Sequence, residues 1–124
     1  MADLTPYLAV RDARAAIDWY AEAFGATVSF DPIVMPDNRI GHVELALGDA
    51  RMMMADEHPE IGVVAPEPDQ AAVTLHLRVA DCAQTTERAV AAGARLDREP
   101  AESAGGIGSV ITDPFGHRRM LRQE

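Results

Sequence analysis

His42 and Glu44 are the pair of side chains in this sequence best suited to acid–base chemistry or to hydrogen bonding with a ligand. They alternate with Val43 and Leu45, so a strand would place the polar pair on one face and the apolar pair on the other. An imidazole beside a carboxylate can transfer a proton or orient a bound molecule. The alternative is a partly solvated sheet face whose polar residues have no specific task.

A second candidate group lies in the alternating segment 74–79, where polar residues again share one face of a predicted strand. This face would present His76 and Arg78. An arginine in such a position recognises an anionic group of a ligand, or it pairs internally with a carboxylate such as Glu44. Both interpretations stay open on the sequence alone.

The charge of the chain excludes several kinds of chemistry. The 124 residues carry 20 Asp and Glu against 11 basic residues, a net charge of −9, and every basic residue is arginine. Without lysine, no Schiff base and no P-loop lysine can form. We expect no nucleic-acid partner, because phosphate binding needs a basic face. We also expect no membrane partner, because no apolar stretch approaches 18 residues.

The single cysteine, Cys82, cannot form an internal disulfide. The sequence also begins without the basic and apolar regions of a signal peptide. Together these features predict a cytoplasmic protein. Cys82 opens a predicted helix, but a nucleophile needs a positioned base and none lies near it in sequence, so we expect a structural role.

Short motifs recur in the same order at offsets of 67 to 69 residues, which indicates two copies of one module. Neither copy is long enough to bury a sufficient core alone, so the two are expected to pair, within one chain or between two chains. The recurring motifs are Val10-Arg11-Asp12 with Val79-Ala80-Asp81, Gly25-Ala26 with Gly93-Ala94, Gly41-His42-Val43 with Gly108-Ser109-Val110, and Gly48 with Gly116.

Each copy is predicted to fold as β-α-β-β-β. Asp12 and Asp81 are expected to cap helices over residues 13–24 and 83–92, with glycines ending both helices. We predict a single domain with module one at 1–56, an acidic, proline-containing linker at 57–70 and module two at 71–124. The expected strands are 7–10, 27–30, 42–47 and 51–55, then 74–79, 95–98, 108–112 and 118–122.

Four segments carry a resemblance over essentially the whole chain: Tyr7 to Asp12, Gly41 to Leu45, Met52 to Glu57, and the turn Asp113-Pro114-Phe115-Gly116-His117. With the paired modules, the sequence resembles the vicinal oxygen chelate superfamily, which includes glyoxalase I, extradiol dioxygenases and bleomycin-resistance proteins. Within it, the chain is similar to a glyoxalase-like branch of uncharacterised function. The resemblance implies an α+β fold, in which an open, cup-shaped eight-stranded mixed sheet carries helices on its outer face and a ligand cavity inside. It also implies a homodimer.

The resemblance further implies one divalent metal ion, held by His, Glu or Gln on the first and last strands of each module. Here the usual positions hold Thr5, Met52, Thr74 and Met120, none of which is a good ligand for such an ion. We therefore expect no metal cofactor.

The alternative is a displaced site for Zn, Ni, Fe or Mn. It would be assembled from side chains that are suitable ligands, namely His42, Glu44, His76 or Glu57.

Strand alternation predicts that the cup is lined by soft apolar side chains with a few polar groups, a lining that suits an organic molecule. The predicted ligand-binding residues are Tyr7, His42, Glu44, Met52, Met54, His76, Arg78, Ser109 and Met120. The hairpin 31–39 is expected to form a lip of the cavity.

Two classes of function follow. The first is a small-molecule binding protein without the usual metal site, which sequesters a cationic or aromatic ligand, because an acidic protein concentrates cations around it. The alternative is a metal-dependent lyase, isomerase or dioxygenase of the glyoxalase type with a displaced metal site. A third hypothesis is metal-free acid–base catalysis by His42 and Glu44.

Overall fold

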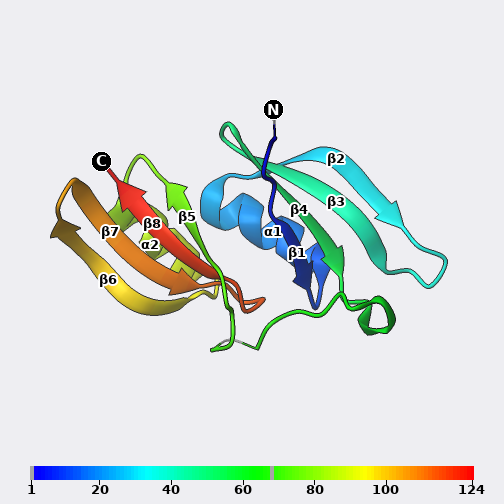
Figure 1. Cartoon of the computed structure of the whole chain (residues 1–124). Helices are drawn as coiled ribbons and strands as arrows, with labels where there is room; N and C mark the ends of the chain where they lie inside the picture. The colour runs from blue at the N-terminus through cyan, green and yellow to red at the C-terminus, as the bar shows by residue number, and fades with distance from the viewer. Residues whose placement is uncertain (1, 68) are drawn as a thin grey trace. The chain divides into compact units, whose positions relative to one another are not determined.

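The computed structural model describes residues 2–67 and 69–124 and divides the chain into two compact units. Unit 1 ends at Ala65, and unit 2 begins at Pro66. Each unit contains one helix and a four-stranded mixed sheet in the order β-α-β-β-β (Figure 1). The predicted α+β class and the predicted repeat are therefore confirmed. The predicted linker 57–70 is divided, with residues 57–65 belonging to unit 1.

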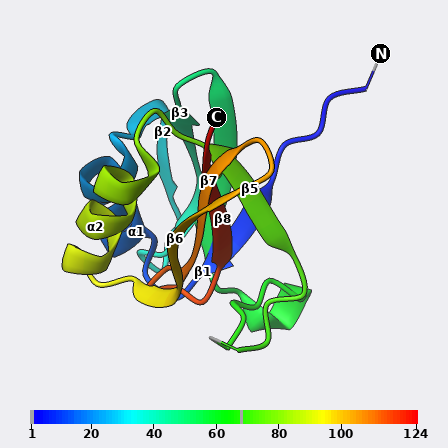
Figure 2. The same cartoon turned by 90° about the vertical axis from the view of Figure 1, so that its left-hand side faces the viewer.

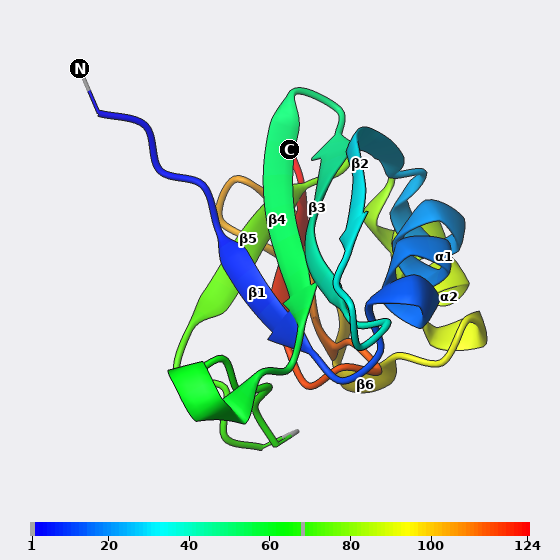
Figure 3. The ribbon, with the colours of Figure 1, turned by 90° about the vertical axis from the view of Figure 1, so that its right-hand side faces the viewer.

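Unit 1 has the strand order β1-β4-β3-β2, with β1 parallel to β4 and the other neighbours antiparallel. A short 3-10 helix, η1 (Pro59–Ile61), follows the sheet. Figure 3 shows α1 on one face of this sheet. The elements are β1 (Tyr7–Val10), α1 (Ala13–Phe24), β2 (Thr27–Val34), β3 (Ile40–Leu47) and β4 (Ala50–Asp56).

Unit 2 repeats this topology with the order β5-β8-β7-β6 and β5 parallel to β8. Figure 2 shows α2 on one face of the second sheet. The elements are β5 (Thr74–Arg78), α2 (Cys82–Ala91), β6 (Arg95–Ser103), β7 (Gly106–Thr112) and β8 (Arg118–Gln123).

Helix α1 begins at the predicted residue, and α2 begins at Cys82, one residue before the predicted start, with both predicted aspartates as caps. The Asp12 carboxylate accepts a hydrogen bond from the Ala15 N–H at 3.0 Å, and Asp81 accepts one from Gln84 N–H at the same distance. Gly25 ends α1 with a left-handed φ of 70°, which glycine adopts without a steric penalty. No helix within 2–67 and 69–124 is long and apolar enough to cross a membrane.

The two faces of each sheet differ. In unit 1, α1 packs against β3 and β4, and Val43, Leu45 and Met54 are fully buried on the face that it covers. In unit 2, α2 packs against β6, β7 and β8, and it covers Ile111 and Leu121. We call the opposite face of each sheet its open face.

Strands β2 and β6 are edge strands, and both are irregular. Each contains an acidic residue followed by proline, Asp31-Pro32 in β2 and Glu99-Pro100 in β6. In both strands the register with the neighbouring strand shifts at this dipeptide, between Phe30 and Ile33 and between Arg98 and Ala101. The repeat therefore includes a matched interruption of the sheet edge.

Candidate functional site

A hydrogen-bonded group of three side chains lies on the open face of unit 1. His42 Nε2 lies 2.8 Å from Glu44 Oε2, and His42 Nδ1 lies 3.2 Å from the Tyr7 hydroxyl. The Tyr7 hydroxyl is also 3.2 Å from the carbonyl oxygen of Gly41. The structure places His42 and Glu44 together on this face, as their alternation predicts. Tyr7 reaches them from β1, which lies at one edge of the sheet.

Two proton arrangements satisfy this group. If His42 is neutral, its Nε2–H donates to Glu44 and its Nδ1 accepts from Tyr7. If His42 is protonated, both ring nitrogens donate, and Tyr7 donates instead to the Gly41 carbonyl. Burial raises the pKa of the Tyr7 phenol above its ordinary value, which favours the protonated hydroxyl in both arrangements. The three side chains can therefore take up or release one proton while staying hydrogen-bonded to each other.

Aromatic rings flank His42 on both sides. The Tyr7 ring centroid is 5.5 Å from that of His42, and the Phe30 centroid is 5.6 Å away in an edge-on arrangement. Phe30 is 48% exposed and Tyr7 is 49% exposed, so both rings offer apolar surface to a ligand. Phe30 is a residue of this group that strand alternation does not predict. The register shift between Val28 and Phe30 sets it opposite Glu44, and regular alternation gives no signal for such a shift.

Met52 and Met54 lie on the helix-covered face of unit 1, so the prediction that they line the open face is wrong. Met52 pairs with Leu45 and Met54 pairs with Val43, and both methionines are buried. Met53 faces the open side instead, opposite Glu44 and Tyr7.

The error comes from the lengths of two turns. Met52 and Met120 each follow a turn glycine, Gly48 or Gly116, by four residues, but the two turns differ in length. The β3–β4 turn contains only residues 48 and 49, whereas the β7–β8 turn spans residues 113–117, with its glycine near the end. A shift of one residue moves a strand residue to the other face of its sheet. Met52 therefore lies on the helix-covered face of unit 1, whereas Met120 lies on the open face of unit 2.

Ser109 also lies on the helix-covered face, against the prediction. Its register partner is the buried Leu121, and its Oγ lies 2.8 Å from Thr86 Oγ1 and 3.5 Å from the Cys82 sulfur. The register pairs Gly108, not Ser109, with an open-face residue, Arg122. Cys82 itself is fully buried, and its N–H donates to Gln123 Oε1 at 2.9 Å, an environment that fits a structural role.

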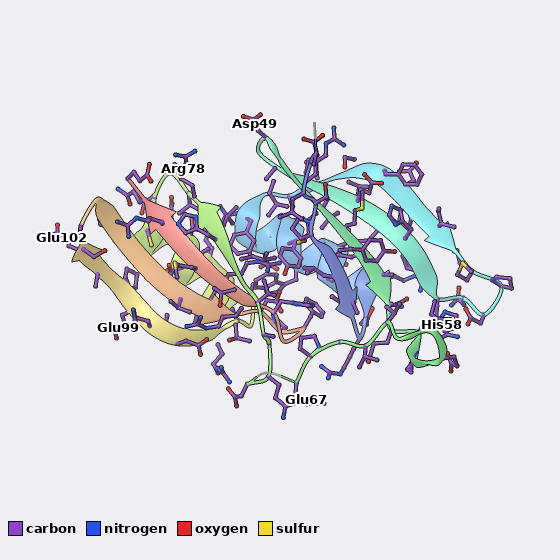
Figure 4. All side chains as sticks on the ribbon, viewed as in Figure 1. Asp49, His58, Glu67, Arg78, Glu99 and Glu102 are labelled. Carbon is purple, nitrogen blue, oxygen red and sulfur yellow. The ribbon has the colours of Figure 1, made fainter. Side chains whose placement is uncertain are left out.

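The open face of unit 2 carries the remaining predicted strand residues. His76 and Met120 are register partners, and Arg78 pairs in register with Arg122. Arg78 Nη1 lies 3.2 Å from Glu124 Oε2, and Figure 4 labels this arginine on β5.

The side chains considered for a metal ion are engaged separately. Thr5 precedes β1, and the Thr74 hydroxyl accepts a hydrogen bond from Arg118 at 2.7 Å. The Glu57 carboxylate accepts from the Ala65 N–H at 3.2 Å and lies 3.6 Å from Arg11. In the described ranges 2–67 and 69–124, no three His, Cys, Asp or Glu side chains are grouped to hold a metal ion. These donors do not fit the ion that the resemblance implies.

A pocket of about 420 Å³ adjoins Tyr7 on unit 1. The β2–β3 hairpin forms one wall, and the segment around η1, where His58 is labelled in Figure 4, forms another. A Cβ on Gly41 would lie only 2.7 Å from the Met35 sulfur, so this glycine leaves room for the Met35 side chain. The lining is Tyr7, Met35, Pro36, Asp37, Arg39, Ile40, Gly41, Ala55, Asp56, Glu57, His58, Ile61 and Val63.

Several polar groups of the pocket are satisfied within the protein. The Asp56 carboxylate accepts from the Ala13 and Ile40 N–H groups, both at 2.7 Å. Arg39 donates to Asp37 at 2.6 Å and to the Glu57 carbonyl at 3.1 Å. The apolar part of the lining is therefore the part most available to a ligand. The sequence predicts that residues 31–39 form a lip. It predicts only a linker for residues 57–70, and therefore gives no indication that residues 57–63 form a wall of this pocket.

A family model for the glyoxalase-like domain matches residues 6–121. The chain belongs to this family. The glyoxalase-like protein is 34% identical over 125 residues to an uncharacterised protein of Mycobacterium bovis, a match that covers 97% of this chain and 82% of the relative. An uncharacterised protein of Mycobacterium tuberculosis is equally similar, with 73% of its length covered. The predicted family resemblance is therefore confirmed.

Two solved structures share the fold of this glyoxalase-like protein. A glyoxalase-related enzyme from Fulvimarina pelagi has a TM-score of 0.76 at 20% identity, covering 100% of this chain and 89% of that one. A bleomycin-binding protein in complex with bleomycin has a TM-score of 0.68 at 22% identity, covering 100% of this chain and 99% of that one. At these identities the likeness shows the fold.

Proposed function

We propose that this glyoxalase-like protein binds a small organic molecule that carries an aromatic ring and a cationic group, and that it does so on the open face of unit 1. The observation that carries the proposal is the His42–Glu44 pair, flanked by the exposed rings of Tyr7 and Phe30 beside the 420 Å³ pocket. The rings provide stacking and cation–π surface, and the Glu44 carboxylate provides a counter-charge.

The charge distribution supports a cationic ligand. Residues 1–65 contain four arginines and eleven Asp and Glu, a net charge of −7, whereas residues 66–124 contain seven arginines and nine Asp and Glu, a net charge of −2. Most of the acidic excess therefore belongs to unit 1. Such a field raises the local concentration of cations around the proposed site. The bleomycin-binding neighbour offers a precedent for ligand capture by this fold.

Thermal-shift measurements with a cationic acridine dye test the proposal, with an anionic anthracenesulfonate as the matched probe. A ligand at a hundred times its Kd adds about 2.7 kcal/mol, which corresponds to a rise in Tm of roughly 8 to 10 °C for a domain of this size. We expect the cationic dye alone to raise the Tm.

Glu44→Gln should weaken binding of the dye about tenfold or more, because it removes the charged acceptor. Asp49→Asn, an exposed carboxylate in the β3–β4 turn of the same unit, is the control and should bind like the unmodified protein. Equal binding by Glu44→Gln and the unmodified protein, or a larger shift with the anionic probe, would contradict the proposal.

A second candidate function is metal-free acid–base catalysis, which the 2.8 Å contact between His42 and Glu44 favours. In that case Glu44→Gln should abolish turnover while a substrate analogue still binds. The proposed binding function needs no metal cofactor. Elemental analysis of protein purified without a His-tag tests this, because stoichiometric Zn, Ni, Fe or Mn would favour the metal-dependent lyase, isomerase or dioxygenase instead.

We further propose that the protein acts as a cytoplasmic homodimer. The family resemblance supports the dimer, and the single, buried Cys82 fits a reducing compartment. Sedimentation velocity of the full chain over a range of concentrations measures the oligomeric state, and a monomer throughout would contradict the dimer.

A further inference from the structure

The open face of unit 2 gathers arginines in a protein of net negative charge. The sheet register places Arg78 on β5 and Arg118 and Arg122 on β8 on this face, together with Arg95 and Arg98 on β6. Five of the eleven arginines of the chain therefore share one face of one four-stranded sheet. The open face of unit 1 carries His42 and Glu44 instead.

Like charges are close neighbours on this surface. Arg78 and Arg122 are register partners on adjacent parallel strands, which lie about 4.8 Å apart in a sheet. Like charges directly opposite each other destabilise a sheet. Arg118 is farther away, because it is four residues from Arg122 along β8 and the two Cα atoms lie about 13 Å apart.

Carboxylates neutralise only part of this charge. Glu124 pairs with Arg78 at 3.2 Å, and Arg95 pairs with Asp97 at 2.6 Å and with Asp69 at 2.8 Å. Burial alone would raise the pKa of Asp97, but hydrogen bonds from Arg95 and Thr112, together with the positive charges of Arg95 and Arg118, outweigh it and lower that pKa, so Asp97 stays ionised.

The three remaining arginines of the face are Arg98, Arg118 and Arg122. Among the residues that the structure describes, no carboxylate lies within ion-pair distance of any of these guanidinium groups.

Neutral groups hold two of these three side chains in place. Arg118 donates to the Thr74 hydroxyl at 2.7 Å. Arg122 donates to Ser103 Oγ at 3.2 Å and to the Ala104 carbonyl, which fixes its guanidinium over the β6–β7 turn. These contacts orient the guanidinium groups without neutralising them, and each guanidinium has five N–H donors, so donors remain for a ligand. Side chains that are already ordered bind a ligand at a lower entropic cost.

We propose that the open face of unit 2 binds an organic anion through its carboxylate or phosphate oxygens, with Arg122 as the principal contact. The exposed Met120 lies two residues before Arg122 on the same face of β8, and its register partner His76 is also exposed. They would contact the body of the ligand. Planar guanidinium groups match both carboxylate and phosphate geometry. This site is separate in residues and in ligand charge from the site proposed in unit 1.

Calorimetric titration of the full chain at low ionic strength, with citrate and pyrophosphate as probes, tests the site. We expect saturable binding of at least one probe. Arg122→Gln should lower the affinity about tenfold or more, because it removes a charged donor. Binding of citrate alone would identify a carboxylate ligand, and binding of pyrophosphate alone would identify a phosphate ligand. Binding of both would show that the site recognises the oxygen atoms that the two kinds of anion share.

Arg88→Gln on α2 is the matched control, since it removes the same charge from the exposed surface of the same unit. It should change the affinity less than twofold, and Arg122→Lys, which keeps the charge but not the planar fork, should retain part of the affinity. Failure of both probes to bind, or equal weakening by Arg88→Gln and Arg122→Gln, would overturn the proposal. Arg122→Gln should leave binding of the acridine dye unchanged, which separates this result from the test of unit 1.

Discussion

The two units share a topology but present different chemistry on their open faces. In both, the first strand runs parallel to the last, and an aspartate caps the helix with a 3.0 Å hydrogen bond. Unit 1 presents a hydrogen-bonded imidazole, carboxylate and phenol between aromatic rings. Unit 2 presents arginines. The repeat therefore preserves what builds a module and varies what a ligand would contact.

The helix-covered faces impose the same requirement on both units. Val43, Leu45 and Met54 in unit 1 and Ile111 and Leu121 in unit 2 are fully buried under a helix, so these positions must stay apolar. An open-face side chain is not constrained by that packing. Conversion between a binding pair and an arginine cluster needs no change in the core.

The largest difference in stability between the units is expected at their last turns. The Asp113 Oδ1 accepts the N–H groups of Phe115 and His117 at 2.9 Å, and its other oxygen lies 3.8 Å from the buried Arg119 guanidinium. Asp113→Ala should lower the free energy of unfolding by about 3 to 5 kcal/mol, because it removes the carboxylate that lies beside the buried, positively charged Arg119 guanidinium.

The corresponding turn of unit 1 has no such carboxylate, and Asp49 is exposed there. Asp49→Ala should change the free energy of unfolding by about 0.5 kcal/mol or less. Urea unfolding of both variants measures the difference. Similar losses in the two variants would contradict the buried ion-pair interpretation.

A second pair of variants separates the two faces of the sheet in unit 1. Met54 is fully buried, so Met54→Ala should lower the free energy of unfolding by about 3 kcal/mol through a cavity. Met53→Ala on the open face should cost about 1 kcal/mol or less and should weaken binding of the acridine dye. Urea midpoints and dye titrations distinguish the two. The reverse pattern would mean that the face assignment of β4 is wrong.

The smallest expected effects test the equivalence of the helix caps. Asp12→Ala and Asp81→Ala should each cost about 1 kcal/mol, because each removes one hydrogen bond of the same length from a helix N-terminus. Hydrogen exchange of the first-turn amides of α1 and α2 reports each loss separately. The exposed Asp18 within α1 is a suitable control. A loss at only one cap would show that the modules do not depend equally on capping.

Local sequence signals predicted the fold and part of the candidate site. Asp12, Asp81 and Gly25 act through adjacent backbone groups, so their roles can be derived from nearby residues. Alternation placed His42 and Glu44 correctly because β3 pairs regularly with β4.

The errors arise where structure depends on turn length or on distant packing. A difference between two turns accounts for the wrong faces predicted for Met52 and Met54, whereas the face of Ser109, which precedes its turn, is set by its register with Leu121. Phe30 reaches Glu44 only through a bulge in β2. The pocket needs residues 57–63 to fold back beside Tyr7, which no local pattern encodes.

The interrupted edge strands bear on how copies of this protein can associate. An exposed edge strand normally offers a row of free N–H and C=O groups with which another chain can form a continuous ladder. Pro32 and Pro100 each lack an N–H group and lie beside a carboxylate within a register shift. A second chain that added itself along β2 or β6 would meet a missing donor and a negative charge in mid-strand. The module thus carries the same barrier to amyloid-like stacking twice, once at each of these edges.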